Sequence, residues 1–195
     1  MMLTTTSALK EWAVAVDALQ QGKTIVLLRK GGIHERGGKF KVAHDQVLLY
    51  PTYEHQQPSL LKPDYAALVT PVSSGLPPET VRIGAYARIT DIFQVSDEPV
   101  VSALLPFHIW TEQFVCDRHR WKPQQPLYIL LLRTYKLTSP QVIPYRQEYG
   151  GCKSWIDLAA SISLDGTPVL DDAAYTAQVS EIDKTIRNSQ VASRK

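Results

Sequence analysis

Basic, aromatic, histidine and glycine residues gather between residues 22 and 57, where the chain is best equipped for chemistry. The segment holds five of the ten glycines and three of the five histidines. Glycine lets backbone amides approach a ligand closely, cations bind phosphate, and aromatic rings stack on bases. The sequence contains no nucleophile elbow, phosphate-binding loop, dinucleotide fingerprint or paired zinc motif. The pattern therefore indicates a binding site rather than a reaction.

The candidate contacts combine groups that suit a flipped or single-stranded base and its flanking phosphates. Cations would meet phosphate, glycines would admit the backbone, and rings would stack on the base. We predict ligand contacts from Arg29, Lys30, Gly31, Gly32, Tyr50, Tyr53, His55, Lys153 and Trp155. The alternative is a tight turn with solvated charges and core aromatics, because most charges are solvated and most aromatics are buried.

A second basic and aromatic segment covers residues 118–122. Its Trp121 could stack on a base while Arg118 and Lys122 meet phosphates, giving a second nucleic-acid contact. We favour the simpler interpretation, in which this segment is a solvated turn beside Pro123.

Two histidine and carboxylate pairs, His44 with Asp45 and Glu54 with His55, have side chains that bind zinc, manganese or iron. Adjacent residues of a strand point to opposite faces, so a metal site would need ligands from different strands. We therefore predict hydrogen-bonding histidines and no metal or other cofactor. No Asp or Glu is followed two positions later by Lys, so we do not expect restriction-type nuclease activity from this chain.

Hydrophobic periodicity supplies the elements that must position these residues. Apolar residues at helical spacing, with Ser7 as N-cap and Gly22 as a stop, predict a helix over 7–21. We predict strands at 24–28, at 42 and 47–50, at 81–90, at 128–137 and at 152–158, with a further piece at 68–72. Helices are predicted from Asp97 to residue 105 and from Asp171 or Asp172 through Ile186.

This order of elements predicts one α+β domain, built on a mixed, mostly antiparallel sheet or small β-barrel with flanking helices. The domain should cover 1–187, and 188–195 should be a flexible tail. With 195 residues, 44% of them hydrophobic, the chain can bury a full core, and a net charge of +2 is too mild to imply nucleic acid by itself. Two cysteines make no disulfide framework, and no apolar run reaches the ~20 residues of a membrane span. We expect a cytoplasmic protein without a membrane segment.

Four phrases resemble an uncharacterised prokaryotic family, common in cyanobacteria and known as domain of unknown function 1802. They are ALKEW at 8–12, LRKGGI at 28–33, LYPTYEH at 49–55 and YGGCKSW at 149–155. The resemblance covers nearly the whole chain but implies no established activity. Some relatives are joined to restriction-type nuclease domains, which implies a nuclease of that type as a possible partner.

A wider likeness concerns the PUA-like superfamily. The phrase GKTI at 22–25, followed by Arg29, looks like the entry to an ASCH domain, and the strands around 81–95 and 127–137 look like those of EVE domains. This likeness implies a small β-barrel that binds RNA, DNA or a modified nucleobase without catalysis. An ASCH-type amide or nucleoside hydrolase is the alternative, with a buried Lys23 activating Thr24 and Glu54 as the acid. A protein-interaction module is the third possibility, and the oligomeric state is open.

Overall fold

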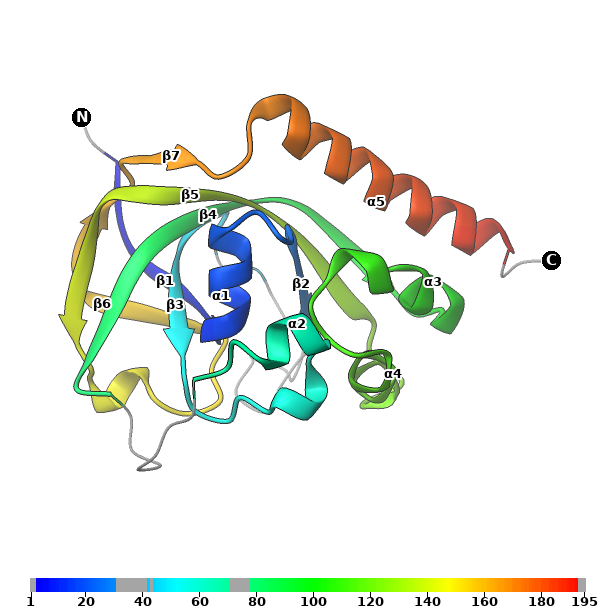
Figure 1. The fold of residues 1–195 in the computed structure, drawn as a ribbon, viewed down its shortest axis with the longest axis horizontal. Helices are drawn as coiled ribbons and strands as arrows, with labels where there is room; N and C mark the ends of the chain where they lie inside the picture. The colour runs from blue at the N-terminus through cyan, green and yellow to red at the C-terminus, as the bar shows by residue number, and fades with distance from the viewer. Residues whose placement is uncertain (1–2, 31–41, 43, 71–77, 193–195) are drawn as a thin grey trace.

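The computed structural model describes residues 3–30, 42, 44–70 and 78–192. Its described part contains one curled, seven-stranded sheet in the order β2-β5-β4-β3-β1-β6, with β7 paired to β5 (Figure 1). The strands are β1 (Thr4–Trp12), β2 (Val26–Arg29), β3 (Gln46–Thr52), β4 (Thr80–Val95), β5 (Leu127–Pro144), β6 (Trp155–Ser163) and β7 (Gly166–Pro168). The β1–β3 pair is parallel and the other pairs are antiparallel. This confirms the predicted fold class, a mixed and mostly antiparallel sheet with flanking helices.

The longest strand pair, β4 with β5, gives the sheet its curl. Its register runs from Val95 opposite Leu127 to Thr80 opposite Pro144, with irregularities near Gly84 and Thr90. Such bulges bend a strand and increase its twist. The alternating apolar residues of β4 are buried, as the sequence predicted, and both strands extend beyond their predicted bounds.

Five α-helices lie around the described sheet: α1 (Ala13–Gln20), α2 (Pro63–Ala66), α3 (Glu98–Ala103), α4 (Glu112–Arg120) and α5 (Asp172–Ala192). Figure 1 shows α1 inside the curve of the sheet, α2, α3 and α4 together at one end, and α5 on the outer side. The backbone N–H of Ala174 donates to the Asp171 carboxylate at 2.7 Å, which confirms Asp171 as the N-cap of α5. None of the described helices is long and apolar enough to span a membrane.

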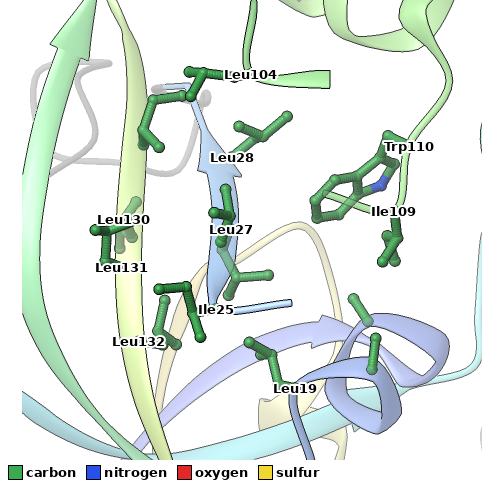
Figure 2. Packing of buried hydrophobic residues seen from close by; sticks show 14 of the residues in the cluster. Leu19, Ile25, Leu27, Leu28, Leu104, Ile109, Trp110, Leu130, Leu131 and Leu132 are labelled. Carbon is green, nitrogen blue, oxygen red and sulfur yellow. The ribbon is translucent and has the colours of Figure 1, made fainter. Parts of the chain in front are cut away.

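The main core lies between β2, β5 and the segment after α3. Figure 2 shows Leu27 and Leu28 of β2 between Leu130 of β5 on one side and Trp110 on the other. All four side chains are buried, and full burial of an apolar side chain stabilises a fold by about 1.5–3 kcal/mol. This packing fixes the end of β2 relative to the segment that leads into α4.

The helix predicted over 7–21 is wrong in its first half, because residues 4–12 form β1. Residues 8–12 pair with β3, and residues 7–9 pair with β6 on the other side. The strand therefore satisfies its backbone groups through two neighbours and is buried on both faces. The helical spacing of Trp12, Val16 and Leu19 spans the junction between β1 and α1.

Other boundaries also differ from the predictions. Strand β6 begins at Trp155 rather than at 152, and residues 118–120 form the last turn of α4 instead of a loop. Residues 68–70 form no strand, and 71–72 lie outside the described residues. Helix α5 continues to Ala192, so the predicted start of a tail at 188 does not coincide with the end of the helix.

Candidate functional site

A cleft of about 460 Å³ opens where β1, β2 and β3 end, opposite α4. The size is within the range of about 300–1,000 Å³ that is typical of small-molecule sites. Among the described residues, five Lys or Arg line it against two glutamates: Lys10, Arg29, Lys30, Arg118 and Lys153, with Glu11 and Glu54. The cleft is therefore a positively charged site in a chain that is almost neutral overall.

Arg29 is held in place at the end of β2 by groups of β1. Its Nη2 lies 3.1 Å from Glu11 Oε2 and also donates to the carbonyl of Lys10. The other Glu11 oxygen accepts the backbone N–H of Trp12 at 2.8 Å. The two side chains are only 11% and 9% exposed, so solvent screens this ion pair weakly. The contact brings β2 close to β1 across the curl of the sheet.

The amines of Lys10 and Lys30 brace the walls of the cleft. Lys10 Nζ donates to the carbonyls of Tyr149 and Gly151, whereas Lys30 Nζ donates to the carbonyl of His119 at the end of α4. Burial lowers the pKa of both lysines, and the nearby Arg118 lowers that of Lys30 further. These amines are occupied by the protein itself, so we regard them as structural parts of the site.

Arg118, in the last turn of α4, differs from the other cations. Its guanidinium carbon lies 5.8 Å from the centroid of the Phe114 ring. Within the described residues it forms no hydrogen bond or ion pair, although the side chain is half-buried. Burial and the neighbouring Arg29 lower the pKa of Arg118, and Glu11 opposes this shift in part. None of the described residues therefore supplies an acceptor to this guanidinium of the cleft.

Aromatic side chains form a second component of the cleft. The rings of Trp12 and Phe114 are 6.2 Å apart, and those of Phe114 and Trp110 are 6.1 Å apart. Trp110 is buried, whereas Trp121 lies at the end of α4 with 44% of its surface exposed. The site thus combines mainly positive charge with the flat apolar surfaces of aromatic rings.

The backbone around the cleft adopts two left-handed conformations. His55 has φ 63°, which is uncommon for a residue with a side chain, and Gly151 has φ 77°. For His55 this conformation costs on the order of 1–3 kcal/mol and often marks a functional site, whereas glycine adopts it without strain. Both residues line the cleft.

The structure brings five of the predicted site residues into this cleft: Arg29, Lys30, Glu54, His55 and Lys153. Tyr50 and Tyr53 line a separate cavity of about 20 Å³, which Lys10 and Glu54 also border. Tyr50 is buried with its ring edge-on to that of Tyr149, and burial raises the pKa of Tyr50. Trp155 packs against the main core. Gly31 and Gly32 lie outside the described residues.

The residues of the alternative hydrolase site do not share a cavity among the described residues. Lys23, predicted to be buried, is exposed. Thr24 is buried, and its hydroxyl donates to the carbonyl of Phe107 at 2.7 Å. Thr24 lines a small cavity that Glu54 does not border. Nor do the described residues contain a group of three or more His, Cys, Asp or Glu positioned to hold a metal ion.

Several residues of the cleft were missed as parts of one site. Arg118 and Trp121 were predicted at most as a separate contact, yet they line the same cleft as Arg29. Trp12 and Phe114 were not predicted as parts of a site. The only signals in the sequence were the basic character of both segments, 29–30 and 118–122, and the aromatic Trp121 within the second.

The fold and the cleft define a mixed-sheet α+β protein with a basic cleft that is partly lined by aromatic rings. The chain belongs to the family described as Domain of unknown function (DUF1802), which matches residues 8–181. No functionally curated protein matches the sequence significantly. A solved structure, a mutant of the ZmASCH protein from Zymomonas mobilis, is similar over 89% of this chain and 94% of that chain. The identity is 13% and the TM-score is 0.46, so this likeness carries no argument about function.

Proposed function

We propose that this protein binds single-stranded nucleic acid, with one nucleotide held in the cleft, and that it has no catalytic activity of its own. The observation that supports the proposal best is the guanidinium of Arg118, which is half-buried beside Arg29 and has no acceptor among the described residues. A phosphate would supply that acceptor and relieve the repulsion between the two arginines.

The energetics favour an anionic ligand at this position. A hydrogen bond to a charged group contributes about 1.5–3 kcal/mol, and a guanidinium can bind a phosphate through two parallel hydrogen bonds. Glu11 neutralises only one of the neighbouring cations, because it is already paired with Arg29. The site therefore has an uncompensated positive charge that a phosphate fits in both sign and geometry.

The aromatic side chains favour a ligand that carries a base in addition to phosphate. Rings such as Trp12 and Phe114, at the wall of the cleft, offer surfaces that stack on a base of any sequence. In a duplex the faces of the bases are covered by their neighbours, so a base must leave its stack to reach such a site. A single strand, or a flipped nucleotide, meets this requirement.

The test is the binding of fluorescently labelled oligonucleotides across a salt series. Single strands and duplexes, with and without modified bases, should be compared on the wild type and on Arg118→Gln. We expect the wild type to prefer single strands and Arg118→Gln to bind them at least tenfold more weakly, since a charged hydrogen bond is lost. The slope of log K against log salt should fall by about 0.7 for one lost phosphate contact.

The matched control is Arg133→Gln, which removes an arginine of similar type from outside the cleft. We expect oligonucleotide binding by this variant to equal that of the wild type. Equal binding by Arg118→Gln and the wild type, or binding that does not respond to salt, would overturn the proposed function.

A further inference from the structure

We infer that the cleft has two subsites and that the indole of Trp121 stacks on the unpaired base of the nucleotide whose phosphate lies at Arg118. This inference rests on the proposed function and specifies it. It assigns the base and the phosphate to different side chains, so the two contributions can be removed separately.

The exposure of Trp121 is the first observation. Among the large hydrophobic side chains that the described residues leave exposed, Trp121 carries the only aromatic ring. Both Trp110 and Trp121 line the cleft, but Trp110 is buried in the core whereas the ring of Trp121 is exposed. Tryptophan exposes a large apolar surface at an energetic cost, and such a surface at the edge of a binding cleft is suited to a flat ligand.

The support of the ring is the second observation. The backbone N–H of Trp121 donates to the carbonyl of Asp117 at 2.9 Å, which attaches the residue to the last turn of α4. Lys122 has φ 52°, and its ammonium lies 4.5 Å from the centroid of the indole ring. A cation over the ring attracts its π-electrons and restrains the side chain. The indole is thus held from one face, and its exposed surface is available to a ligand.

The position of Trp121 relative to Arg118 is the third observation. Residues three apart at the end of a helix lie on the same side, about 5–6 Å apart at their Cβ atoms. The guanidinium and the indole therefore line the cleft from adjacent places on α4. A single nucleotide has its phosphate and base in a comparable arrangement, linked through the sugar.

The experiment compares two probes, inorganic pyrophosphate and a short single-stranded oligonucleotide, by isothermal titration. Trp121→Ala should weaken oligonucleotide binding about tenfold and leave pyrophosphate binding unchanged, because stacking is lost and the phosphate contacts remain. Trp121→Phe should keep most of the oligonucleotide affinity, since it retains a ring. Arg118→Gln should weaken the binding of both probes. Val142→Ala, at another exposed apolar residue outside the cleft, is the control and should change neither.

The outcomes separate this inference from the proposed function. If Trp121→Ala binds the oligonucleotide normally while Arg118→Gln does not, the base subsite is wrong and the proposed function stands. If Trp121→Ala weakens both probes equally, the separation into two subsites is wrong. If neither variant affects oligonucleotide binding, both the inference and the proposed function fail.

Discussion

Two arginines over aromatic rings, Arg133 on the outer side of the sheet and Arg118 in the cleft, have opposite surroundings. The Arg133 guanidinium carbon lies 5.3 Å from the Tyr175 ring centroid, and Nη2 pairs with the Asp172 carboxylate. That hydrogen bond raises the pKa of Arg133. Arg118 lies similarly over Phe114, but burial and a second arginine lower its pKa. Similar aromatic contacts thus occur with an arginine that is paired with a carboxylate in one region and, among the described residues, with an unpaired arginine in the other.

The residues around the two arginines also differ in how far their polar groups are paired within the protein. Near Arg133, the hydroxyls of Thr90 and Tyr175 are 2.6 Å apart, and the rings of Tyr86 and Tyr135 stack at 4.8 Å. The first contact attaches α5 to the sheet, and the second lies between β4 and β5. In the cleft, by contrast, most charges have the same sign. The comparison shows that a charged side chain is better recognised as a candidate for ligand binding by the partners it lacks than by its residue type.

The largest effect that sharpens this comparison concerns His108, which has no hydrogen-bond partner for its ring nitrogens among the described residues and is 3% exposed. Burial, and then the charge of Lys62, lower the pKa of His108 from 6.5 to about 3. The unfolded chain therefore binds a proton more readily, and stability should fall as the pH decreases from 6.5 to about 3. The loss is on the order of 1 kcal/mol per pH unit.

Urea unfolding at several pH values should show this slope in the wild type and a flatter one in His108→Leu. Carboxylates titrate in the same range in both proteins, so the difference between the two curves is the relevant quantity. Parallel curves would contradict the prediction. Both His108 and Arg118 have side chains without a hydrogen-bond partner among the described residues. Because the side chain of His108 is closed off from solvent, we expect this lack to affect the stability of the protein. At Arg118, which lines the cleft, we expect it to affect ligand binding.

The next largest effect is expected from Glu11→Gln. This change removes the carboxylate that offsets both Arg29 and Arg118, and it leaves a mostly buried cation without its partner. The unfolding free energy should fall by about 3 kcal/mol, as it does when one member of a buried ion pair is removed. Urea unfolding measures the change.

A suitable control is Glu148→Gln. Glu148 pairs with Arg146 at 3.7 Å on the surface, where both side chains are at least half exposed. Exposed pairs of this kind contribute little to stability. If Glu11→Gln and Glu148→Gln were equally stable, the prediction that the buried carboxylate of Glu11 stabilises the fold would be wrong.

The smallest effects come from removing the two arginines themselves and recording stability. Arg133→Gln should lose about 1 kcal/mol, because an ion pair and a cation–π contact disappear. Arg118→Gln should be as stable as the wild type or more stable by about 0.5 kcal/mol, since repulsion from Arg29 is relieved. Thermal unfolding of both variants in low salt tests the pair. A larger loss in Arg118→Gln than in Arg133→Gln would break the comparison.

The parts of the fold that the sequence predicted well are those with a simple period. Strand β4 alternates cleanly, β5 begins with a long apolar run that contains aromatic residues, and α5 has a clear stripe with Asp171 before it. Strand β1 was misassigned because a strand buried on both faces has no alternation. Its apolar residues then continued the helical spacing of α1 by coincidence.

The sequence predicted which residue types form the site, but not which distant segments come together to form it. Arg29, Lys30, His55 and Lys153 stood out by their type and by their glycine-rich or aromatic neighbours. The contribution of α4 depends on how the chain between β4 and β5 folds back toward the ends of β1 and β2. No local pattern encodes that return, so the position of Arg118 in the same cleft as Arg29 and Lys30 emerged only from the structure.

The position of β1 between β3 and β6 has a consequence for biosynthesis. Ser7 of β1 donates to Asp157 of β6, which lies 150 residues further along the chain. During translation, the first strand must therefore wait for nearly the whole polypeptide before its second edge is covered. Closing so long a loop is slow, and an open apolar edge invites pairing with other chains. The nascent protein is thus most exposed to aggregation until β6 leaves the ribosome.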